Sequence, residues 1–180
     1  MQYKLALTRL ADQIICMQNK KRVYLLLYEG SYVSELLKLE NQLCHRFYTL
    51  SNAFTRAYRP LLKTLDITYP QYVTLMALWE TDNLTIAELL TRTAIDGGAM
   101  SLMLKKLESK GLLQVVKDES DKRAKRVLLT QKGMDAKTTA EQVPKQMLCK
   151  LHGMTTEESR QLKDLLDKLG GCFANDELDE

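Results

Sequence analysis

Cys44 lies in a segment whose residue types could do thiol chemistry, LENQLCHRFY (residues 39–48). His45 is its neighbour and Tyr48 follows about one helical turn later, so a nucleophile, an imidazole and a phenol stand together. Such a thiol could be a small core residue, a metal ligand or a redox sensor. The four cysteines are widely spaced and form no CxxC pair: Cys16, Cys44, Cys149 and Cys172. Because no second His or Cys lies at ligand spacing beside His45, we expect neither a metal site nor a cofactor.

The hydrophobic spacing around Cys44 predicts one long amphipathic helix. From Val33 to Leu65, apolar residues recur at steps of three and four over about eight turns. Cys44 would then lie in the middle of a helix, where the helix macrodipole gives a thiolate little support. Tyr58 lies roughly 21 Å further along such a helix, at about 1.5 Å per residue. It could therefore reach Cys44 only from a second, antiparallel copy of the chain.

The order of the following elements predicts a winged helix-turn-helix. Pro70 opens a helix, Thr85 and Glu88 form a capping box for a short helix, and a further helix ends at Gly111. Two β-rich runs then flank a charged tip, which indicates a hairpin. The expected later elements are a helix over 132–150 kinked at Pro144 and a last helix that begins after Thr155 or Thr156 and stops at Gly170.

Basic residues gather where a DNA-binding surface would lie. The net charge of +3 arises within residues 1–33, whereas residues 105–126 carry eight Lys and Arg against four Asp and Glu. The candidate recognition helix, 98–110, should bury Met100, Met103, Leu104 and Leu107 and direct Ser101, Lys105 and Lys106 to the major groove. The expected wing tip holds Lys122, Arg123, Lys125 and Arg126. These side chains suit phosphates or the adjacent minor groove.

Individual motifs in these elements resemble those of a known protein family. ESDKRAKRVLLTQKG resembles the wing signature D-x-R-x5-L-T-x-x-G of the MarR family. The matching positions are Asp121, Arg123, Leu129, Thr130 and Gly133. LENQLC, YRPLLKTLDITYPQY and LMALWE resemble a narrower group, the OhrR repressors that sense organic hydroperoxides. The resemblance spans about residues 34–173. We therefore interpret residues 1–33 as an N-terminal extension of unknown role, because VSELLKLENQLC looks like a natural beginning.

The resemblance implies a mainly α homodimer of winged helix-turn-helix subunits, with long dimerisation helices, a two-stranded β wing and a palindromic DNA operator. Residues 34–180 would form this domain, with the DNA-binding lobe at about 70–131 and the dimerisation helices at about 34–65 and 132–171. A peroxidase-type detoxification gene would be repressed until an organic hydroperoxide oxidises the sensor. The recognition segment DGGAMSLM departs from the family pattern, which leaves the operator sequence open.

The resemblance also implies roles for individual residues. Cys44 falls on the peroxidatic cysteine, and Tyr58 and Tyr69 fall on tyrosines that hydrogen-bond it. Cys149 resembles the resolving cysteine of two-cysteine members, which forms an intersubunit disulfide. Positions that organise the recognition helix and the wing are Asp96, Asp121 and Arg123. Cys16 and Cys172 receive no role.

Two other functions stay open on the sequence. One is a thiol peroxidase that uses Cys44. The expected absence of a helix N-terminus beside the thiol speaks against this function. The other is a MarR-type repressor that is relieved by a small ligand or by another oxidant, such as hypochlorite or a quinone. No stretch is apolar enough to span a bilayer, and the N-terminus lacks the order of a signal peptide, so we expect a cytoplasmic protein with no membrane partner.

Overall fold

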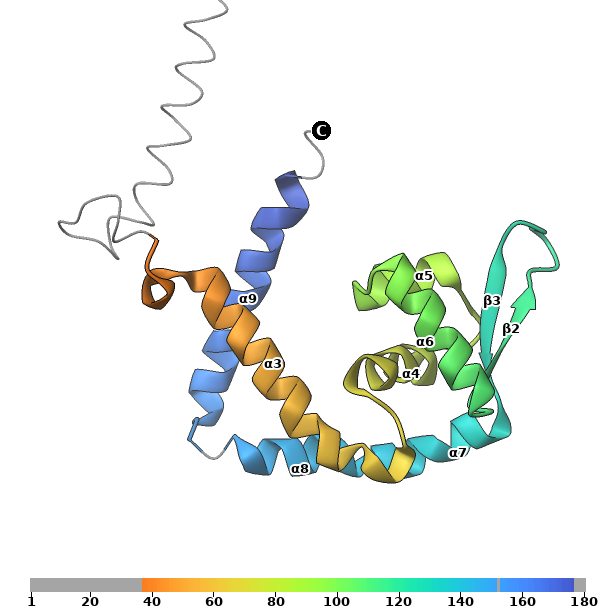
Figure 1. The fold of residues 1–180 in the computed structure, drawn as a ribbon, viewed down its shortest axis with the longest axis horizontal. Coiled ribbons are helices and arrows are strands. Elements are labelled where there is room, and N and C mark those ends of the chain that lie inside the picture. The colour runs from red at the N-terminus through yellow and green to blue at the C-terminus, as the bar shows by residue number, and fades with distance from the viewer. Residues whose placement is uncertain (1–36, 152, 177–180) are drawn as a thin grey trace, which may run out of the picture. The chain divides into compact units, whose positions relative to one another are not determined.

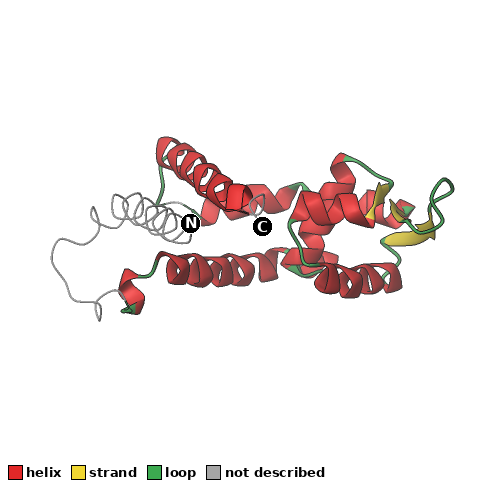
Figure 2. Ribbon diagram, turned by 90° about the horizontal axis from the view of Figure 1, so that it is seen from above, coloured by secondary structure: helices red, strands yellow, loops and turns green. Residues whose placement is uncertain are grey.

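The computed structural model describes residues 37–151 and 153–176, which are mainly helical with one small sheet (Figures 1 and 2). The expected N-terminal extension, residues 1–33 with Cys16, lies outside the described residues. The chain forms two compact units, Met1–Asn52 and Ala53–Glu180. Among the described helices, none is long and apolar enough to cross a membrane.

The helix that carries Cys44 is shorter than its hydrophobic spacing predicts. A 3-10 turn, η1 (Leu39–Asn41), precedes α3 (Leu43–Leu61), and a second turn, η2 (Lys63–Leu65), follows it. Gln42 separates η1 from α3 with an extended backbone, φ −87° and ψ 116°. After α3, Asp66 ends the segment in a left-handed conformation with φ 51°. The prediction of one continuous helix to Leu65 is therefore wrong at both ends of α3.

The helix-turn-helix forms where the capping residues predict it. The elements are α4 (Tyr69–Glu80), β1 (Leu84–Thr85), α5 (Ile86–Thr93) and α6 (Gly97–Ser109). Pro70 lies in the first turn of α4, where its missing N–H costs no helical hydrogen bond. The Thr85 hydroxyl accepts the Glu88 N–H at 3.2 Å and the Glu88 carboxylate accepts the Thr85 N–H at 2.7 Å, which confirms the capping box. Gly111 follows α6 with φ 69° and ends it.

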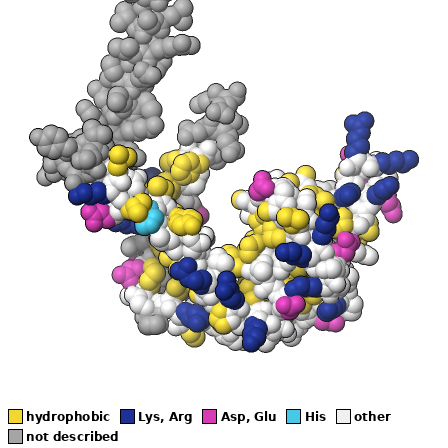
Figure 3. Space-filling view, viewed as in Figure 1, with side chains coloured by type: hydrophobic (Ala, Val, Ile, Leu, Met, Phe, Trp, Pro, Cys, Tyr) yellow, Lys and Arg dark blue, Asp and Glu magenta, His cyan; other side chains and the backbone are white. Residues whose placement is uncertain are grey.

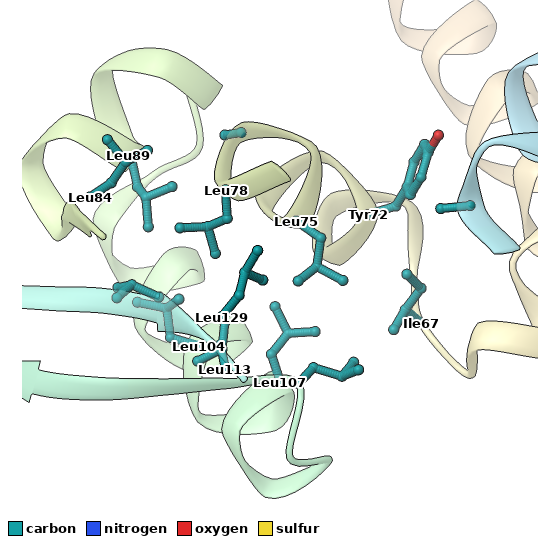
Figure 4. Packing of buried hydrophobic residues seen from close by; sticks show 14 of the residues in the cluster. Ile67, Tyr72, Leu75, Leu78, Leu84, Leu89, Leu104, Leu107, Leu113 and Leu129 are labelled. Atoms are coloured by element: carbon teal, nitrogen blue, oxygen red, sulfur yellow. The ribbon is translucent and has the colours of Figure 1, made fainter. Parts of the chain in front are cut away.

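The predicted hairpin is confirmed as β2 (Leu113–Lys117) and β3 (Lys125–Leu129). The sheet is antiparallel in the order β1-β3-β2, and Leu113 pairs with Leu129 in its register. Leucines of α4, α5, α6 and the strands converge in one core (Figure 4), to which Met100 and Leu104 of α6 contribute as predicted, while Met103 is half-buried. Gly133 of the wing signature packs closely against the backbone of Leu112. A Cβ at this position would lie 1.9 Å from the Leu112 carbonyl oxygen.

In the described part of the chain, the hairpin is followed by α7 (Gln131–Ala140), α8 (Gln142–Lys150) and α9 (Thr156–Asp176). The break between α7 and α8 follows from Pro144, which cannot donate to the Ala140 carbonyl one turn earlier. Thr155 caps α9 together with Glu158, whose N–H donates to the Thr155 hydroxyl at 3.2 Å. The predicted stop at Gly170 is wrong, because α9 continues to Asp176 without a left-handed residue.

Candidate nucleic-acid interface and thiol site

The first candidate surface is a groove between α6 and the hairpin. Ser101 and Lys105 line it from α6, and Lys117 and Lys125 line it from β2 and β3. Glu108 is the acidic residue of this lining, and its carboxylate accepts the Val115 N–H at 3.0 Å, which ties α6 to β2. Three lysines from three elements thus converge on one groove, whose field favours a polyanion.

Two lysines on this face differ in their relation to the groove. Lys106 is exposed on α6 but does not line the groove. Lys117 does line it, yet the sequence prediction left it out. Its position in β2 gave the available signal: it pairs directly with Lys125 across the hairpin, so both side chains lie on the same face.

Asp96 occupies the position that orders the recognition helix. Its carboxylate oxygen accepts the N–H of Gly98 at 2.8 Å and that of Ala99 at 3.2 Å, which makes it the N-cap of α6. Two glycines open this helix, and glycine holds helical conformation poorly. The cap therefore fixes the end of α6 that carries Ser101 toward the groove.

The wing tip presents exposed cations. Lys122, Arg123 and Lys125 are all exposed, and Figure 3 shows Lys and Arg side chains gathered at the end of the hairpin. The Asp121 carboxylate accepts the Arg123 N–H at 2.9 Å and so shapes the turn beneath the tip. This arrangement leaves the Arg123 guanidinium on the surface, where it can reach a nucleic-acid backbone or groove.

Arg126 lies apart from those tip residues. Its Nε donates to the buried carboxylate of Asp118, and its Nη1 donates to the Asn83 carbonyl oxygen at 2.7 Å. The pKa of Asp118 lies well below its usual range, because its carboxylate accepts hydrogen bonds from Ser120, Asp121 and Arg126. The sequence grouped Arg126 with the DNA-contacting residues, whereas the structure shows it bound to other parts of the same lobe.

Cys44 is the second residue of α3 and so lies in its first turn. Backbone N–H groups there have no intrahelical acceptor, and the macrodipole favours a negative charge. The thiol is exposed, and its Sγ donates to Oε1 of Gln42 at 3.9 Å. The prediction of a mid-helix thiol is therefore wrong, because the extended Gln42 makes the helix begin at Leu43.

The predicted tyrosines form one aromatic cluster. The rings of Tyr58 and Tyr69 lie 4.5 Å apart between centroids with a tilt of 37°, and Tyr72 lies 6.1 Å from Tyr58. Burial, and then the neighbouring Tyr69 and Tyr72, raise the pKa of Tyr58, so its phenol stays protonated and able to donate. Along α3, the fourteen residues from Cys44 to Tyr58 correspond to roughly 21 Å. Tyr58 therefore cannot reach the Cys44 of its own helix.

Two further cysteines are exposed thiols. Cys149 lies near the end of α8, and Cys172 lies within α9, where its Sγ donates to the Lys168 carbonyl oxygen at 3.5 Å. Large apolar side chains are also exposed on these helices and on α3: Leu43, Phe47, Leu50, Leu148, Leu162, Leu165, Leu166 and Phe173. In residues 37–151 and 153–176, no group of three or more His, Cys, Asp or Glu side chains is placed to hold a metal ion.

Sequence comparisons link this chain to known proteins. Residues 67–125 match the model of the MarR family. The organic hydroperoxide resistance transcriptional regulator of Bacillus subtilis is 39% identical over 133 residues, which are 74% of this chain and 88% of that protein. The transcriptional regulator SarZ of Staphylococcus saprophyticus is 35% identical over 128 residues, which are 71% of this chain and 87% of SarZ.

Solved structures with a similar fold include complexes with DNA. Reduced AbfR bound to DNA is 28% identical with a TM-score of 0.67, and the match covers 78% of this chain and 96% of AbfR. The complex of Staphylococcus aureus MepR with DNA is 26% identical with a TM-score of 0.67, and the match covers 73% of this chain and 98% of MepR. The predicted mainly α winged helix-turn-helix fold is thereby confirmed.

Proposed function

The chain belongs to the MarR family, whose members are DNA-binding transcriptional regulators rather than enzymes, and from this premise we propose that it is a dimeric repressor that releases its operator when an organic hydroperoxide oxidises Cys44. The observation that carries the proposal is the exposed thiol in the first turn of α3. A relative that is 39% identical is an organic hydroperoxide resistance regulator, which supports the class of oxidant. Bound to chromosomal DNA, the protein would act in the cytoplasm.

The DNA-binding part of the proposal assigns α6 to the major groove and the hairpin to the flanking backbone or minor groove. Ser101, Lys105 and Lys106 would face the bases or phosphates from α6, and the wing would contribute Lys122, Arg123 and Lys125. Two such lobes in a dimer match a palindromic operator with half-sites about one DNA turn apart. The groove cation Lys117 joins this set.

The dimer part rests on apolar side chains that the single chain leaves exposed. They lie on α3, α8 and α9, and a second copy could cover them. We assign dimerisation to residues 34–65 and 132–171 on this basis. The dimer also resolves a geometric problem, because Tyr58 and Cys44 of one α3 are roughly 21 Å apart along the helix. Phenols of the partner would serve each thiolate if the two α3 helices run antiparallel.

The redox step is a nucleophilic displacement. The Cys44 thiolate attacks the terminal oxygen of the hydroperoxide, the O–O bond breaks, and the alkoxide takes a proton to leave as an alcohol. Cys44 is then a sulfenic acid. Attack by the Cys149 thiol on that sulfur forms a disulfide and releases water. A disulfide needs its Cα atoms within about 7 Å, and the reduced dimer should keep the two thiols farther apart than that. Formation of the bond would then move α8 and with it the α7 that follows the wing.

Non-reducing electrophoresis tests the resolving step. Treatment with cumene hydroperoxide should give a covalent dimer in the wild type and none in Cys44→Ser or Cys149→Ser. Cys172→Ser is the matched control, because Cys172 is also an exposed thiol on a late helix. A dimer that persists in Cys149→Ser but disappears in Cys172→Ser would transfer the role to Cys172. A monomer that has released DNA would indicate a mixed disulfide with a small thiol.

A further inference from the structure

The base of the wing is held by a charged network that the DNA-contact assignment does not use. Asp118 is 6% exposed, although carboxylates seldom lie so deep in a protein. Its Oδ1 accepts the N–H of Ser120 at 2.8 Å and that of Asp121 at 2.9 Å, and its Oδ2 accepts Nε of Arg126. Both carboxylate oxygens therefore have donors, which makes this buried charge tolerable.

Arg126 joins that carboxylate to a different part of the lobe. Its Nη1 donates to the carbonyl oxygen of Asn83, 43 residues earlier, in the loop between α4 and β1. Asn83 itself has a left-handed backbone with φ 58°, so this loop has a defined shape that presents the carbonyl. The adjacent Asp82 carboxylate accepts the Leu129 N–H at 2.9 Å, which fixes the same loop to the other end of β3.

The network also meets the first helix of the helix-turn-helix. Arg126 pairs with Thr85 in the β1–β3 register, and Thr85 is the N-cap of α5. Hydrogen bonds from Thr85, followed by the weaker fields of Arg126 and Arg92, lower the pKa of Glu88, the other member of that capping box. One guanidinium thus lies between the wing turn, the α4–β1 loop and the start of α5.

From this arrangement we propose that Arg126 is a positioning residue, which fixes the wing against the helix-turn-helix through Asp118 and Asn83 and does not itself contact DNA. The proposal rests on the proposed DNA-binding function and refines it. Asp118 neutralises Arg126, so the charges available to DNA are those of the groove and the tip. The wing tip can deliver Arg123 to a fixed place only if its base is held, because the hairpin extends beyond the core.

Substitutions at the two ends of the pair separate positioning from direct contact. If Arg126 positions the wing, Arg126→Met and Asp118→Ala should each weaken specific DNA binding about tenfold. The double variant should bind DNA no less tightly than the single variant with the lower affinity. If Arg126 instead contacts a phosphate, Asp118→Ala should leave binding unchanged or tighten it, since it removes a negative charge and frees the guanidinium. Tighter or unchanged binding by Asp118→Ala would overturn the proposal.

A second variant keeps the charge and guards against misfolding. Arg126→Lys preserves a cation that could still contact a phosphate, but one ammonium group lacks the planar fork that spans Asp118 and Asn83. It should weaken binding like Arg126→Met, with the salt dependence of binding unchanged. Arg123→Ala is the control, for which the slope of log K against log salt should become shallower by about 0.9 per lost phosphate contact. Wild-type affinity in Arg126→Lys, or a shallower slope, would contradict the positioning role.

Hydrogen exchange of the DNA-free protein distinguishes failure of this inference from failure of the proposed function. In Arg126→Met, the backbone N–H groups of Asp118 and Ala124, at the base of the wing turn, should exchange faster while those of α4 stay protected. If the wild type binds no DNA at all, the proposed function fails. Faster exchange at the wing turn of Arg126→Met can still be measured in that case, because the experiment uses no DNA. Unchanged exchange at the wing turn would remove Arg126 as its anchor.

Discussion

Removing the N-cap of α6 should loosen the recognition helix by a predictable amount. Asp96→Ala deletes the acceptor for the N–H groups of Gly98 and Ala99, which lie 2.8 and 3.2 Å from its Oδ1. Loss of an N-cap costs about 1 kcal/mol, within a range of roughly 0.5–2 kcal/mol. For a chain of this length, that corresponds to a melting temperature lower by about 2–4 °C.

The same change should weaken DNA binding, because a frayed first turn must be re-ordered in the complex. A cost of about 1 kcal/mol corresponds to roughly fivefold weaker binding for each subunit. Thermal unfolding followed by circular dichroism and DNA titration followed by fluorescence anisotropy measure the two effects. Asp96→Asn is the matched control, because its amide oxygen can still accept the N–H groups and should retain most of the stability.

A compensating change in the same turn sharpens the experiment. A Cβ on Gly97 would meet only Cδ1 of Leu90, at 3.9 Å, an ordinary van der Waals contact. Gly97→Ala should therefore stabilise α6 by about 0.4–1 kcal/mol, and should restore part of the loss when combined with Asp96→Ala. Wild-type melting temperature and DNA affinity in Asp96→Ala would refute the role of the cap.

Three further predictions concern the wing, the tyrosines and acid stability. Arg123→Ala should weaken specific DNA binding by about 1–3 kcal/mol and leave the melting temperature unchanged, because the side chain is exposed at the tip; equal binding at all salt concentrations would exclude the wing from DNA. Tyr58→Phe should slow oxidation of Cys44, followed by stopped-flow thiol titration, because it removes a phenol donor; an unchanged rate would leave Tyr58 a packing role. The pKa of Asp118 lies below its ordinary 3.8 in the folded protein, so its stabilising contribution is present above that pH and is lost as the pH falls below it. Asp118→Asn should accordingly flatten the acid side of the stability–pH curve, and an unchanged curve would show that this carboxylate is not linked to folding.

Local chemistry made much of the DNA-binding lobe predictable. The capping box of Thr85 and Glu88 and the left-handed Gly111 are signals within a few residues, and both are present in the structure. The hairpin follows from two β-rich runs around a charged tip. Such signals act over one turn of helix or one strand pair, so they survive whatever tertiary packing surrounds them.

The differences arise where local patterns are ambiguous or partners are distant. Hydrophobic spacing continues through Gln42, so it could not show that α3 begins at Leu43 and places Cys44 in its first turn. Gly170 could stop a helix, but a glycine in right-handed conformation also continues one. The partners of Arg126 lie eight and 43 residues away, and no local rule pairs them. Composition alone therefore predicts DNA contact for this basic residue of the wing.

Anisotropy of labelled promoter DNA, titrated with reduced protein and then with one equivalent of cumene hydroperoxide per subunit, tests redox sensing by Cys44 most directly. The wild type should bind, should release the DNA after oxidation, and should bind again once a thiol reductant is added. Cys44→Ser should bind equally well and should stay bound, because its hydroxyl is not an ionised nucleophile near neutral pH. Release of DNA by oxidised Cys44→Ser, or by a phenolic ligand alone under reducing conditions, would contradict redox sensing by this thiol.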